Sequence, residues 1–364
     1  MDAVRNLLDE GRLDGYAPGF REGYRFGGCQ AVLDDIPVEP LGRHHWRVLY
    51  IPQGFDAIDR SIMDALEQIA AECKVASAAE MVAEAATYQP DLVLVMNALH
   101  VFPADHAEHI QLVRQMGIRT AVWFVDDPYF TDDTALLCRH YDDVFTHEIS
   151  AVSFYKEMGC PRVHYLPLAA SSTLYSPQKT APKYHFDVAF IGNAFWNRVA
   201  LFDEMATFLK HKKVLIAGGF WERLTQKENL NPFVRSGWIP PEETARYYNG
   251  SRIVINIHRP TTVGMDNHNS RDLPGHSINP RTYEINACGT LQMTDIREGL
   301  KTYYRPGYDI ETFNDAQDLM SKIEYYLAHE EERLQVAWRS LCTTRKYHTY
   351  PDRIRRLLDT SSSY

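Results

Sequence analysis

Apolar runs alternate with segments of helical periodicity over the first half of the chain. The runs predict strands at 48–51, 91–96, 120–125, 144–146 and 163–166, and the segments between them predict helices near 58–72, 78–88, 105–116 and 149–158. The run from 91 to 96 is continuous, which is typical of a strand buried on both faces of a parallel sheet. The alternation predicts a doubly wound α/β domain over residues 46–170.

A second series of the same kind follows an aperiodic stretch at 167–182, whose prolines mark it as a linker. Strands are predicted at 187–191, 213–217, 253–257 and 290–293, with helices near 196–210, 241–249 and 280–287. Three further helices are predicted near 314–328, 330–340 and 343–358. The fold class is therefore α/β, with two Rossmann-like domains, the second over residues 171–345, that face each other across a cleft.

Residues 1–45 form a distinct N-terminal arm. Glycines recur there every four residues, at 11, 15, 19, 23 and 27, and Tyr16, Phe20 and Tyr24 follow three of them. On a helix this spacing places the glycines on one face, although Pro18 and the glycines lower helix stability. We expect the arm to pack on the domain as a helix or an irregular segment. The alternative is a self-association surface that forms a homodimer.

Composition and charge narrow the classes of function. The chain has 364 residues, a length that exceeds one ordinary domain of about 150 residues, and 45% of its residues are hydrophobic. Its net charge of −10 is uneven: residues 1–170 carry 13 Lys and Arg against 26 Asp and Glu, whereas residues 171–364 carry 25 against 22. An acidic chain without long basic runs is not expected to bind nucleic acid, but its second half suits a small polyanion.

The sequence predicts neither export nor a membrane anchor. The six cysteines are dispersed and form no CxxC pair, so reduced thiols are expected. The N-terminal residues lack the apolar core of a signal peptide, and no segment approaches the ~20 apolar residues of a membrane span. We therefore expect a cytoplasmic protein without a membrane span.

Ligands of open α/β sheets bind beyond the carboxyl ends of the strands, so the residues after each apolar run are candidates. After the strand at 187–191 come Gly192 and Asn193, where backbone can approach a ligand, and then a helix whose first N–H groups suit an anion. Arg198, about one turn into that helix, adds a guanidinium group for a phosphate. The alternative is an ordinary strand-to-helix connection with a solvated arginine.

The stretch 276–289 holds a second and stronger constellation. Asn279 is a good N-cap and Pro280 a good first helical residue. Arg281 then falls in the first turn, with Glu284 three residues later on the same face. The arginine and the helix amides would bind a diphosphate, and the carboxylate one turn deeper would bind vicinal ribose hydroxyls. The alternative is a surface salt bridge between the two side chains.

These motifs occur in an order that resembles a known family. The stretches that carry the resemblance are 281–290 (RTYEINACGT), 308–313 (YDIETF), 347–353 (YHTYPDR), 190–193 (FIGN) with Arg198, and 237–240 (GWIP) leading into 247–249 (YYN). Together they are similar to the CgeB-like, spore-maturation-type glycosyltransferases of the GT-B fold, well over residues 185–358 and in outline before them. The resemblance implies an acceptor held by the N-terminal domain and a donor held by the C-terminal domain. It also implies a final helix, at 346–364, that crosses back to brace the N-terminal domain.

The resemblance further implies the roles of the donor-site residues. Glu284 would hold the ribose, Arg281 and Arg198 would neutralise the diphosphate, and the backbone near Trp238 and Ile239 would contact the base. The full predicted donor-binding set is Gly192, Asn193, Arg198, Trp238, Ile239, His276, Ser277, Asn279, Arg281 and Glu284. The donor would be a nucleoside diphosphate sugar of the UDP or dTDP type, and the enzyme would use no cofactor and no metal. Retaining enzymes of this fold commonly carry Glu-x7-Glu ending at the ribose residue. Here His276 stands eight positions before Glu284, which leaves retention or inversion open.

The acceptor half offers physical candidates only. Asp127 follows a predicted central strand and is the first candidate for a general base, and His100 is the second. The alternatives are a turn-forming Asp-Asp-Pro sequence and a histidine with a packing role. The i,i+3 pair His106 and His109 lacks further ligands at suitable spacing, so no metal site is predicted.

The residues and the resemblance together predict a metal-independent hexosyltransferase. It would move a sugar from a nucleoside diphosphate donor to a hydroxyl of a glycan, small-molecule or protein acceptor. The alternative is a catalytically silent protein that binds sugar nucleotides or glycans during surface or spore-coat assembly.

Overall fold

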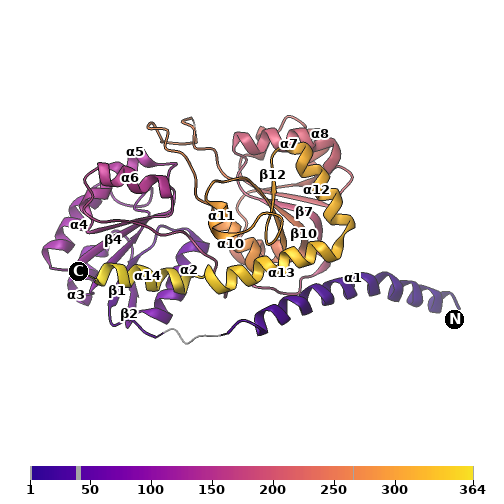
Figure 1. Cartoon of the computed structure of the whole chain (residues 1–364), viewed down its shortest axis with the longest axis horizontal. Coiled ribbons are helices and arrows are strands. Elements are labelled where there is room, and N and C mark those ends of the chain that lie inside the picture. The colour runs from indigo at the N-terminus through magenta and orange to yellow at the C-terminus, as the bar shows by residue number, and fades with distance from the viewer. Residues whose placement is uncertain (1, 38–41, 265, 364) are drawn as a thin grey trace.

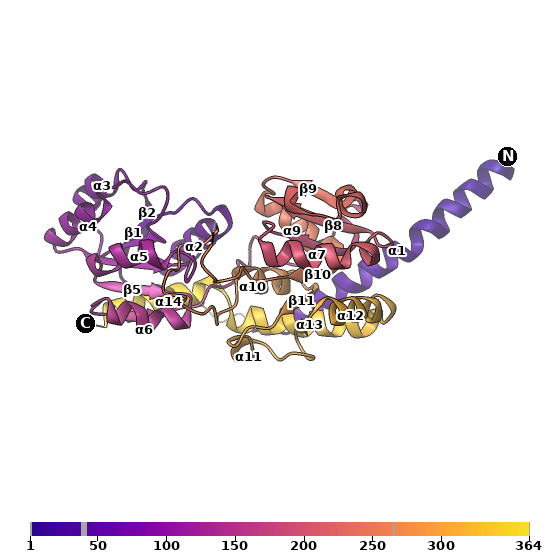
Figure 2. The same cartoon turned by 90° about the horizontal axis from the view of Figure 1, so that it is seen from above.

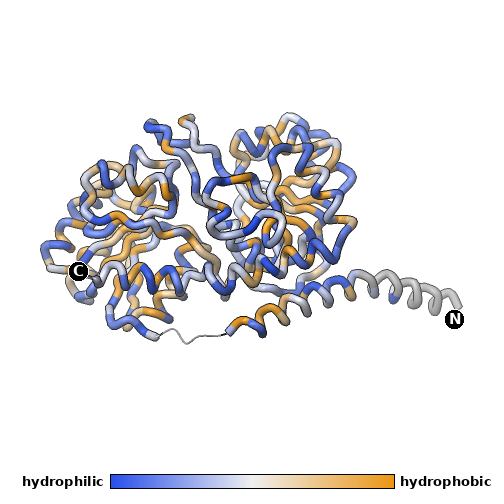
Figure 3. The backbone as a smooth tube through the Cα atoms, in the orientation of Figure 1, coloured by the Kyte–Doolittle hydropathy of each residue, from blue (hydrophilic) through white to orange (hydrophobic). Residues whose placement is uncertain are grey.

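The computed structural model describes residues 2–37, 42–264 and 266–363, so parts of the predicted segments 1–45 and 346–364 lie outside the described residues. Two parallel six-stranded sheets, each flanked by helices, stand side by side in the molecule (Figures 1 and 2). The hydrophobic stretches of the chain concentrate in the strands of both sheets, as Figure 3 shows. The two doubly wound domains predicted from the apolar runs are therefore present.

The first sheet has the strand order β2-β1-β3-β4-β5-β6, and all neighbouring strands are parallel. Its strands are β1 (Arg47–Ile51), β2 (Glu72–Val75), β3 (Leu92–Met96), β4 (Arg119–Phe124), β5 (Asp143–Thr146) and β6 (Val163–Tyr165). The helices around it are α2 (Asp56–Ile69), α3 (Met81–Tyr88), α4 (His106–Gln115), α5 (Thr131–Leu137) and α6 (Ile149–Glu157). Every residue of β3 is buried because helices cover both faces of the sheet.

The second sheet has the order β12-β11-β10-β7-β8-β9 and is also parallel throughout. Its strands are β7 (Phe186–Ile191), β8 (Val214–Gly218), β9 (Val234–Ser236), β10 (Ser251–Asn256), β11 (Leu291–Asp295) and β12 (Glu311–Phe313). Its helices are α7 (Trp196–Leu209), α8 (Lys227–Leu230), α9 (Pro241–Gly250), α10 (Pro280–Ala287), α11 (Leu300–Tyr303) and α12 (Ala316–Ala328). The chain reverses its direction of travel across this sheet between β7 and β10, which is where ligands of such sheets bind.

Two long C-terminal helices connect the domains. Helix α13 (Glu330–Tyr347) packs against α10 and β11 of the second domain, and α14 (Tyr350–Ser362) packs against α2 of the first. Ile354 and Leu357 of α14 share a hydrophobic core with Ile62 of α2. The C-terminal helices therefore cross from the second domain to the first, as predicted (Figure 1).

The predicted arm contains one helix, α1 (Asp2–Asp34), whose C-terminal part packs on α13. The close contact is made by Gly28, where a Cβ atom would lie 2.1 Å from the Trp338 indole ring. The five periodic glycines have no heavy atom within 4 Å of the place a Cβ would take. The glycine face is thus not the packed face. The N-terminal part of α1 extends beyond the second domain in both views (Figures 1 and 2).

The sequence does not predict three of the strands or the four-residue helices α8 and α11, and it misplaces one helix boundary. Strands β2, β9 and β12 are not predicted, and each lies at a sheet edge. Edge strands are short and half exposed, so pairing with a neighbour creates them without an apolar run. The predicted helix break between residues 340 and 343 is wrong, because α13 continues to Tyr347. The break falls at His348 and Thr349, and Pro351 begins the first turn of α14.

Candidate active site

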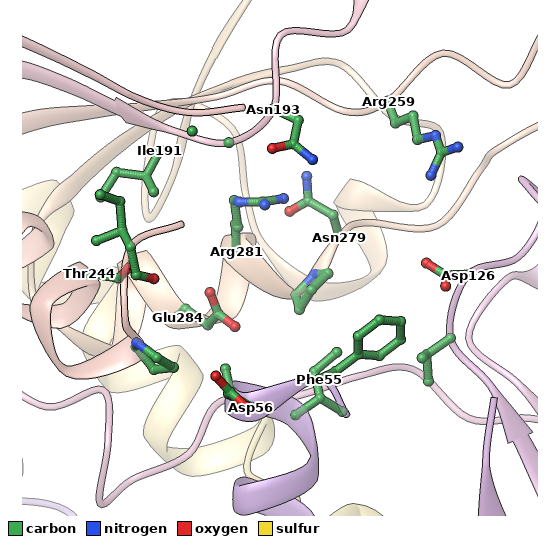
Figure 4. Close-up of a pocket in the computed structure, with 18 of the residues that line it drawn as sticks. Phe55, Asp56, Asp126, Ile191, Asn193, Thr244, Arg259, Asn279, Arg281 and Glu284 are labelled. Carbon is green, nitrogen blue, oxygen red and sulfur yellow. The ribbon is translucent and has the colours of Figure 1, made fainter. Parts of the chain in front are cut away.

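A cavity of about 620 Å³ lies between the domains, beyond the carboxyl ends of strands from both sheets. Figure 4 shows side chains from both domains around it. Those labelled are Phe55, Asp56 and Asp126 from the first domain, and Ile191, Asn193, Thr244, Arg259, Asn279, Arg281 and Glu284 from the second. The cavity is thus a site that neither domain forms alone.

On the second domain, the cavity is bordered by the Gly192–Asn193 loop, whose backbone contacts the backbone at the end of β8. At Gly218, where φ is +137°, a Cβ atom would lie 2.2 Å from the carbonyl oxygen of Gly192. Only glycine fits at this position, because of both the close approach and the backbone conformation. The Asn193 side-chain oxygen accepts a hydrogen bond from the Gly219 N–H at 3.0 Å. The predicted Gly192–Asn193 loop is therefore held against the end of β8, and both residues line the cavity.

Arg198 lies behind this loop and is only 2% exposed. Its Nη1 donates to the carbonyl oxygen of Asn193 at 2.8 Å, and its Nε and Nη2 donate to that of Ile257 at 3.1 and 2.6 Å. Burial, with the nearby positive charge of Arg281, lowers the pKa of Arg198 to about 9. No described acidic side chain forms an ion pair with it. Arg198 therefore holds the loop and places an unbalanced positive charge under the cavity.

The N-terminus of α10 faces the cavity and is capped as predicted. Asn279 accepts a hydrogen bond from the Thr282 N–H, and Pro280 occupies the first turn. The Asn279 N–H in turn donates to Nε2 of His258 at 3.1 Å. Because Nε2 accepts, Nδ1 carries the proton and donates to Asp295 at 2.6 Å. This buried His–Asp pair fixes the helix start against the ends of β10 and β11.

Arg281 and Glu284 both line the cavity, one turn apart on α10. The alternative of a surface salt bridge is wrong, because Glu284 is only 8% exposed and forms no ion pair with any described residue. Burial raises the pKa of Glu284 to about 7, and the charge of Arg281 partly offsets that rise. No described group donates a hydrogen bond to its carboxylate. The side chain therefore presents unsatisfied acceptor oxygens to the cavity.

The predicted base-contact residues lie at the edge of the same cavity. Ile239 is buried, whereas the Trp238 side chain is 73% exposed. They follow Gly237, which has a φ of +100°, and precede α9. An exposed indole next to a buried aliphatic side chain can cover a flat ring that enters the cavity.

On the first domain, Asp126 and Asp127 both belong to the cavity lining, and Asp126 is the one labelled in Figure 4. Asn97, at the end of β3, donates from Nδ2 to Asp126 Oδ2 at 2.9 Å and accepts from the Asp126 N–H at 3.2 Å. Burial raises the pKa of Asp126, and Arg259 is the largest of the influences that oppose the rise. One half-buried carboxylate is thus held at the acceptor side by an amide from the neighbouring strand.

Asp127 lies at the cavity as predicted, but the hydrogen bonds of its carboxyl group do not favour the predicted role of general base. Its Oδ2 accepts from Thr146 Oγ1 at 2.6 Å and its Oδ1 accepts from the Tyr155 hydroxyl at 2.7 Å. Both partners are fully buried in the domain. Burial raises the pKa of Asp127 to about 7. Its carboxyl group therefore joins β4, β5 and α6 and is not presented to an acceptor hydroxyl.

His100 and His276 are also corrected by the structure, because neither lines the cavity. His100 is exposed and its ring packs edge-on against Phe130, with the centroids 4.9 Å apart. The His276 ring pairs with Glu298 at 2.8 Å. Sequence position after a strand, or spacing before Glu284, does not determine where these two rings point.

Ser277 does line the cavity, and Glu148 of the first domain holds the backbone around it. The Oε2 atom of Glu148 accepts from the N–H groups of His276 and Ser277 at 3.1 and 2.9 Å. Ser277 Oγ accepts from the Ile149 N–H at 3.1 Å. These bonds fasten the segment before α10 to the N-terminus of α6 across the domain boundary.

Arg259 was missed by the sequence reasoning, although it follows the predicted strand at 253–257. Its guanidinium carbon lies 4.6 Å from the ring centroid of Tyr129, 5.1 Å from that of Phe130 and 4.7 Å from that of Phe195. Two of these rings belong to the first domain and one to the second. The rule that pointed to Asn193, a polar residue just beyond a strand, also identifies Arg259. The same rule identifies Glu148, which stands two residues beyond the predicted strand at 144–146. Asp56 carries no such signal, because it lies five residues beyond the predicted strand at 48–51, at the first position of α2.

Among the described residues, no group of three or more His, Cys, Asp or Glu side chains is arranged to hold a metal ion. The described helices include none with the length and apolarity needed to cross a membrane.

Comparisons with solved structures agree with this architecture. Sucrose-phosphate synthase from Thermosynechococcus elongatus is similar with a TM-score of 0.58 and 12% identity, over 87% of this chain and all of that one. HepE from Anabaena, solved in complex with UDP-glucose, gives a TM-score of 0.59 and 12% identity over 88% of this chain and all of its own. These likenesses show the GT-B fold. A putative UDP-N-acetylglucosamine 2-epimerase from Listeria monocytogenes shares it too, with a TM-score of 0.53 and 9% identity over 88% of this chain and 96% of that one.

Sequence comparison gives the family. The sequence model of a family described as glycosyl transferase-like matches residues 198–359. Spore protein CgeB of Bacillus subtilis (strain 168) is 31% identical over 302 residues, which are 80% of this chain and 91% of that protein. The chain therefore belongs to the glycosyltransferase family of the spore protein CgeB.

Proposed function

We propose that this glycosyltransferase takes a hexosyl group from a nucleoside diphosphate sugar of the UDP or dTDP type. The observation that carries the proposal is the polarity of the cavity wall on the second domain. The guanidinium group of Arg281 lies near enough to that of Arg198 to lower the pKa of Arg198. No described carboxylate forms an ion pair with either group. A diphosphate in the cavity would relieve this repulsion and bind at the start of α10, where the helix dipole favours an anion.

Glu284 completes the proposed donor site. Its carboxylate oxygens line the same cavity one helical turn after Arg281 and accept no hydrogen bond from a described group. Vicinal hydroxyls would supply the donors that the carboxylate lacks. The base would then lie against Ile239 and Trp238. The HepE complex with UDP-glucose, on the same fold, supports a uridine donor here.

We assign the acceptor side to Asp126. A one-step displacement forms a bond between the acceptor oxygen and the anomeric carbon while the bond to the diphosphate oxygen breaks. The acceptor proton then needs a base. Among the first-domain carboxylates that line the cavity, we choose Asp126, which Asn97 holds in place. If transfer instead retains configuration, the departing diphosphate can accept the proton. Asp126→Asn distinguishes the two, because it should lower kcat about 100-fold or more only in the first case.

The acceptor class itself remains a glycan, a small-molecule hydroxyl or a protein. We also propose that transfer needs no metal ion, since the two arginines supply the positive charge at the diphosphate. Activity that survives EDTA would support this, and activity restored only by Mg²⁺ or Mn²⁺ would contradict it.

The donor site is tested by calorimetric titration with UDP, dTDP, GDP and uridine. Arg281→Ala should weaken UDP binding about 10- to 100-fold, the value of a charged hydrogen bond, while uridine binding changes little. Arg246→Ala, an exposed arginine on α9, is the matched control and should leave both affinities unchanged. Equal losses for UDP and uridine in Arg281→Ala would contradict the diphosphate role. Nucleotide binding without transfer to any acceptor would favour a silent binding protein.

A further inference from the structure

A second cavity, of about 280 Å³, lies beside the amino ends of β7, β8 and β10, in the seam between α1 and the second domain. It is lined by Pro18, Arg21, Glu22 and Arg25 of α1, by residues 185–187, Lys213 and 249–252, and by Glu330 and Arg333 of α13. Five of the lining residues are Lys or Arg and three are Asp or Glu. The lining is therefore net positive in a chain whose overall charge is −10.

Glu22 binds Arg25 through two hydrogen bonds, at 3.0 and 3.2 Å, whereas the other two carboxylates lie farther from their arginines. Arg252 lies 3.5 Å from Asp187 and 3.7 Å from Glu330, and Arg333 lies 3.6 Å from the same Glu330. A charge-assisted N–H···O bond is shorter, at about 2.7–2.9 Å. Glu330 thus faces two arginines without a short ion pair to either, and these arginines also donate to the carbonyl oxygens of Leu327 and Arg252.

Two of the arginines are almost fully buried and retain N–H groups without partners. Arg25 and Arg333 are 5% and 4% exposed, yet Nη1 of Arg25 and Nε of Arg333 have no hydrogen-bond partner. Burial, together with the nearby arginines 252, 25 and 21, lowers the pKa of Arg333 to about 10. A buried donor without a partner lowers the free energy of unfolding, so these N–H groups indicate that a ligand with acceptor atoms binds here.

We propose that the seam cavity binds a phosphoryl group, either of a phosphate ester or of a diphosphate. Arginine forks match phosphate oxygens in number and geometry, and a doubly charged phosphate balances the excess charge of the lining. The volume lies at the lower end of small-molecule sites, about 300–1,000 Å³, which suits a pyrophosphate or a small phosphate ester. Because α1 contributes Arg25, the ligand would also fasten this helix to the domain.

The site is tested on the full chain by hydrogen exchange with sodium pyrophosphate. Pyrophosphate should slow amide exchange of residues 18–28 of α1, which do not line the interdomain cavity. The protection should persist in Arg281→Ala, so a failure of the donor-site proposal is distinguished from a failure here. Arg333→Gln should raise the pyrophosphate concentration for half-protection about tenfold or more.

Controls make the outcome decisive. Arg339→Gln changes an arginine of the same helix that contacts Tyr308 outside the cavity, and it should leave the protection unchanged. If Arg333→Gln fails to fold by circular dichroism, Arg252→Gln takes its place, because that side chain is 31% exposed. Absent protection of residues 18–28, equal protection in the folded cavity variant, or equal protection by sodium sulfate would overturn the assignment.

Discussion

Replacing Glu284 by Gln tests both the electrostatics and the chemistry of the cavity. Glu284 is buried, its pKa is raised from 4.5 to about 7, and only Arg281 opposes that rise. Glutamine keeps the size and one acceptor oxygen but cannot carry a charge. The substitution therefore removes the buried charge with little change in packing.

The size of the effect follows from the pKa. One pKa unit corresponds to about 1.4 kcal/mol, so an increase from 4.5 to about 7 costs about 3 kcal/mol of stability when the group is ionised in both states. The native state holds the proton more tightly than the unfolded state, so the free energy of unfolding falls as pH rises between these values. Below pH ~4.5 both states are protonated and the cost is absent.

The assay is urea unfolding of the unliganded wild type and Glu284→Gln at several values between pH 5 and 8. We expect the variant to gain stability relative to the wild type as pH rises, by up to about 3 kcal/mol at pH 8. Asp127, whose pKa is also about 7, contributes equally to both proteins and cancels in the difference. The same variant should bind UDP about 10- to 100-fold more weakly, because a charged acceptor for the ribose hydroxyls is lost.

Glu324→Gln serves as the control, because that carboxylate is 65% exposed on α12. Its stability difference from the wild type should not vary over this pH range. Parallel curves for wild type and Glu284→Gln would refute the buried-charge reasoning. A retained UDP affinity would refute the ribose role while leaving the electrostatic result intact.

Three other substitutions test the architecture of the site. Gly218→Ala should lower the free energy of unfolding by about 2 kcal/mol or more, because its Cβ would meet the neighbouring backbone and its φ is +137°. An unchanged urea midpoint would contradict this. The control is Gly23→Ala, where a Cβ would lie in open space. Arg198→Lys should cost about 2–4 kcal/mol, since one ammonium group cannot reproduce three bonds to two buried carbonyls, and wild-type stability would argue against the role of this arginine in holding the loop. Glu148→Gln should speed amide exchange at residues 276 and 277, which its carboxylate accepts from; exchange as slow as in the wild type would show that the interdomain bonds are not needed.

Local chemistry explains why the framework of the site is predictable. The interior strands are recognisable in the sequence by their apolar runs, because a strand buried on both faces excludes polar residues. Asn279, Pro280 and Glu284 are likewise predictable, because capping and the helical repeat act within a few residues. The position of α10 and its side chains at the cavity follows from these local rules.

The two aspartates at the end of β4 show what local sequence rules do not predict. Asp126 and Asp127 are adjacent in the chain, and consecutive side chains of extended backbone point to opposite sides. Both line the cavity, but Thr146 and Tyr155, whose buried hydroxyls come from other elements, bond the carboxyl group of Asp127 inside the domain. The sequence predicts a carboxylate at this strand end but not its direction.

The sequence by itself determined the two parallel domains, the capped helix α10 and nine residues that line the cavity on the second domain, although it misplaced His276 and missed Arg259. The tertiary structure alone decided the edge strands β2, β9 and β12, the contact of Gly28 with α13, and the interdomain bonds of Glu148. The physical reason is the range of the interactions. Burial periodicity and capping are encoded within one element, whereas edge pairing, the direction of a polar side chain and contacts between domains depend on residues far apart in the chain.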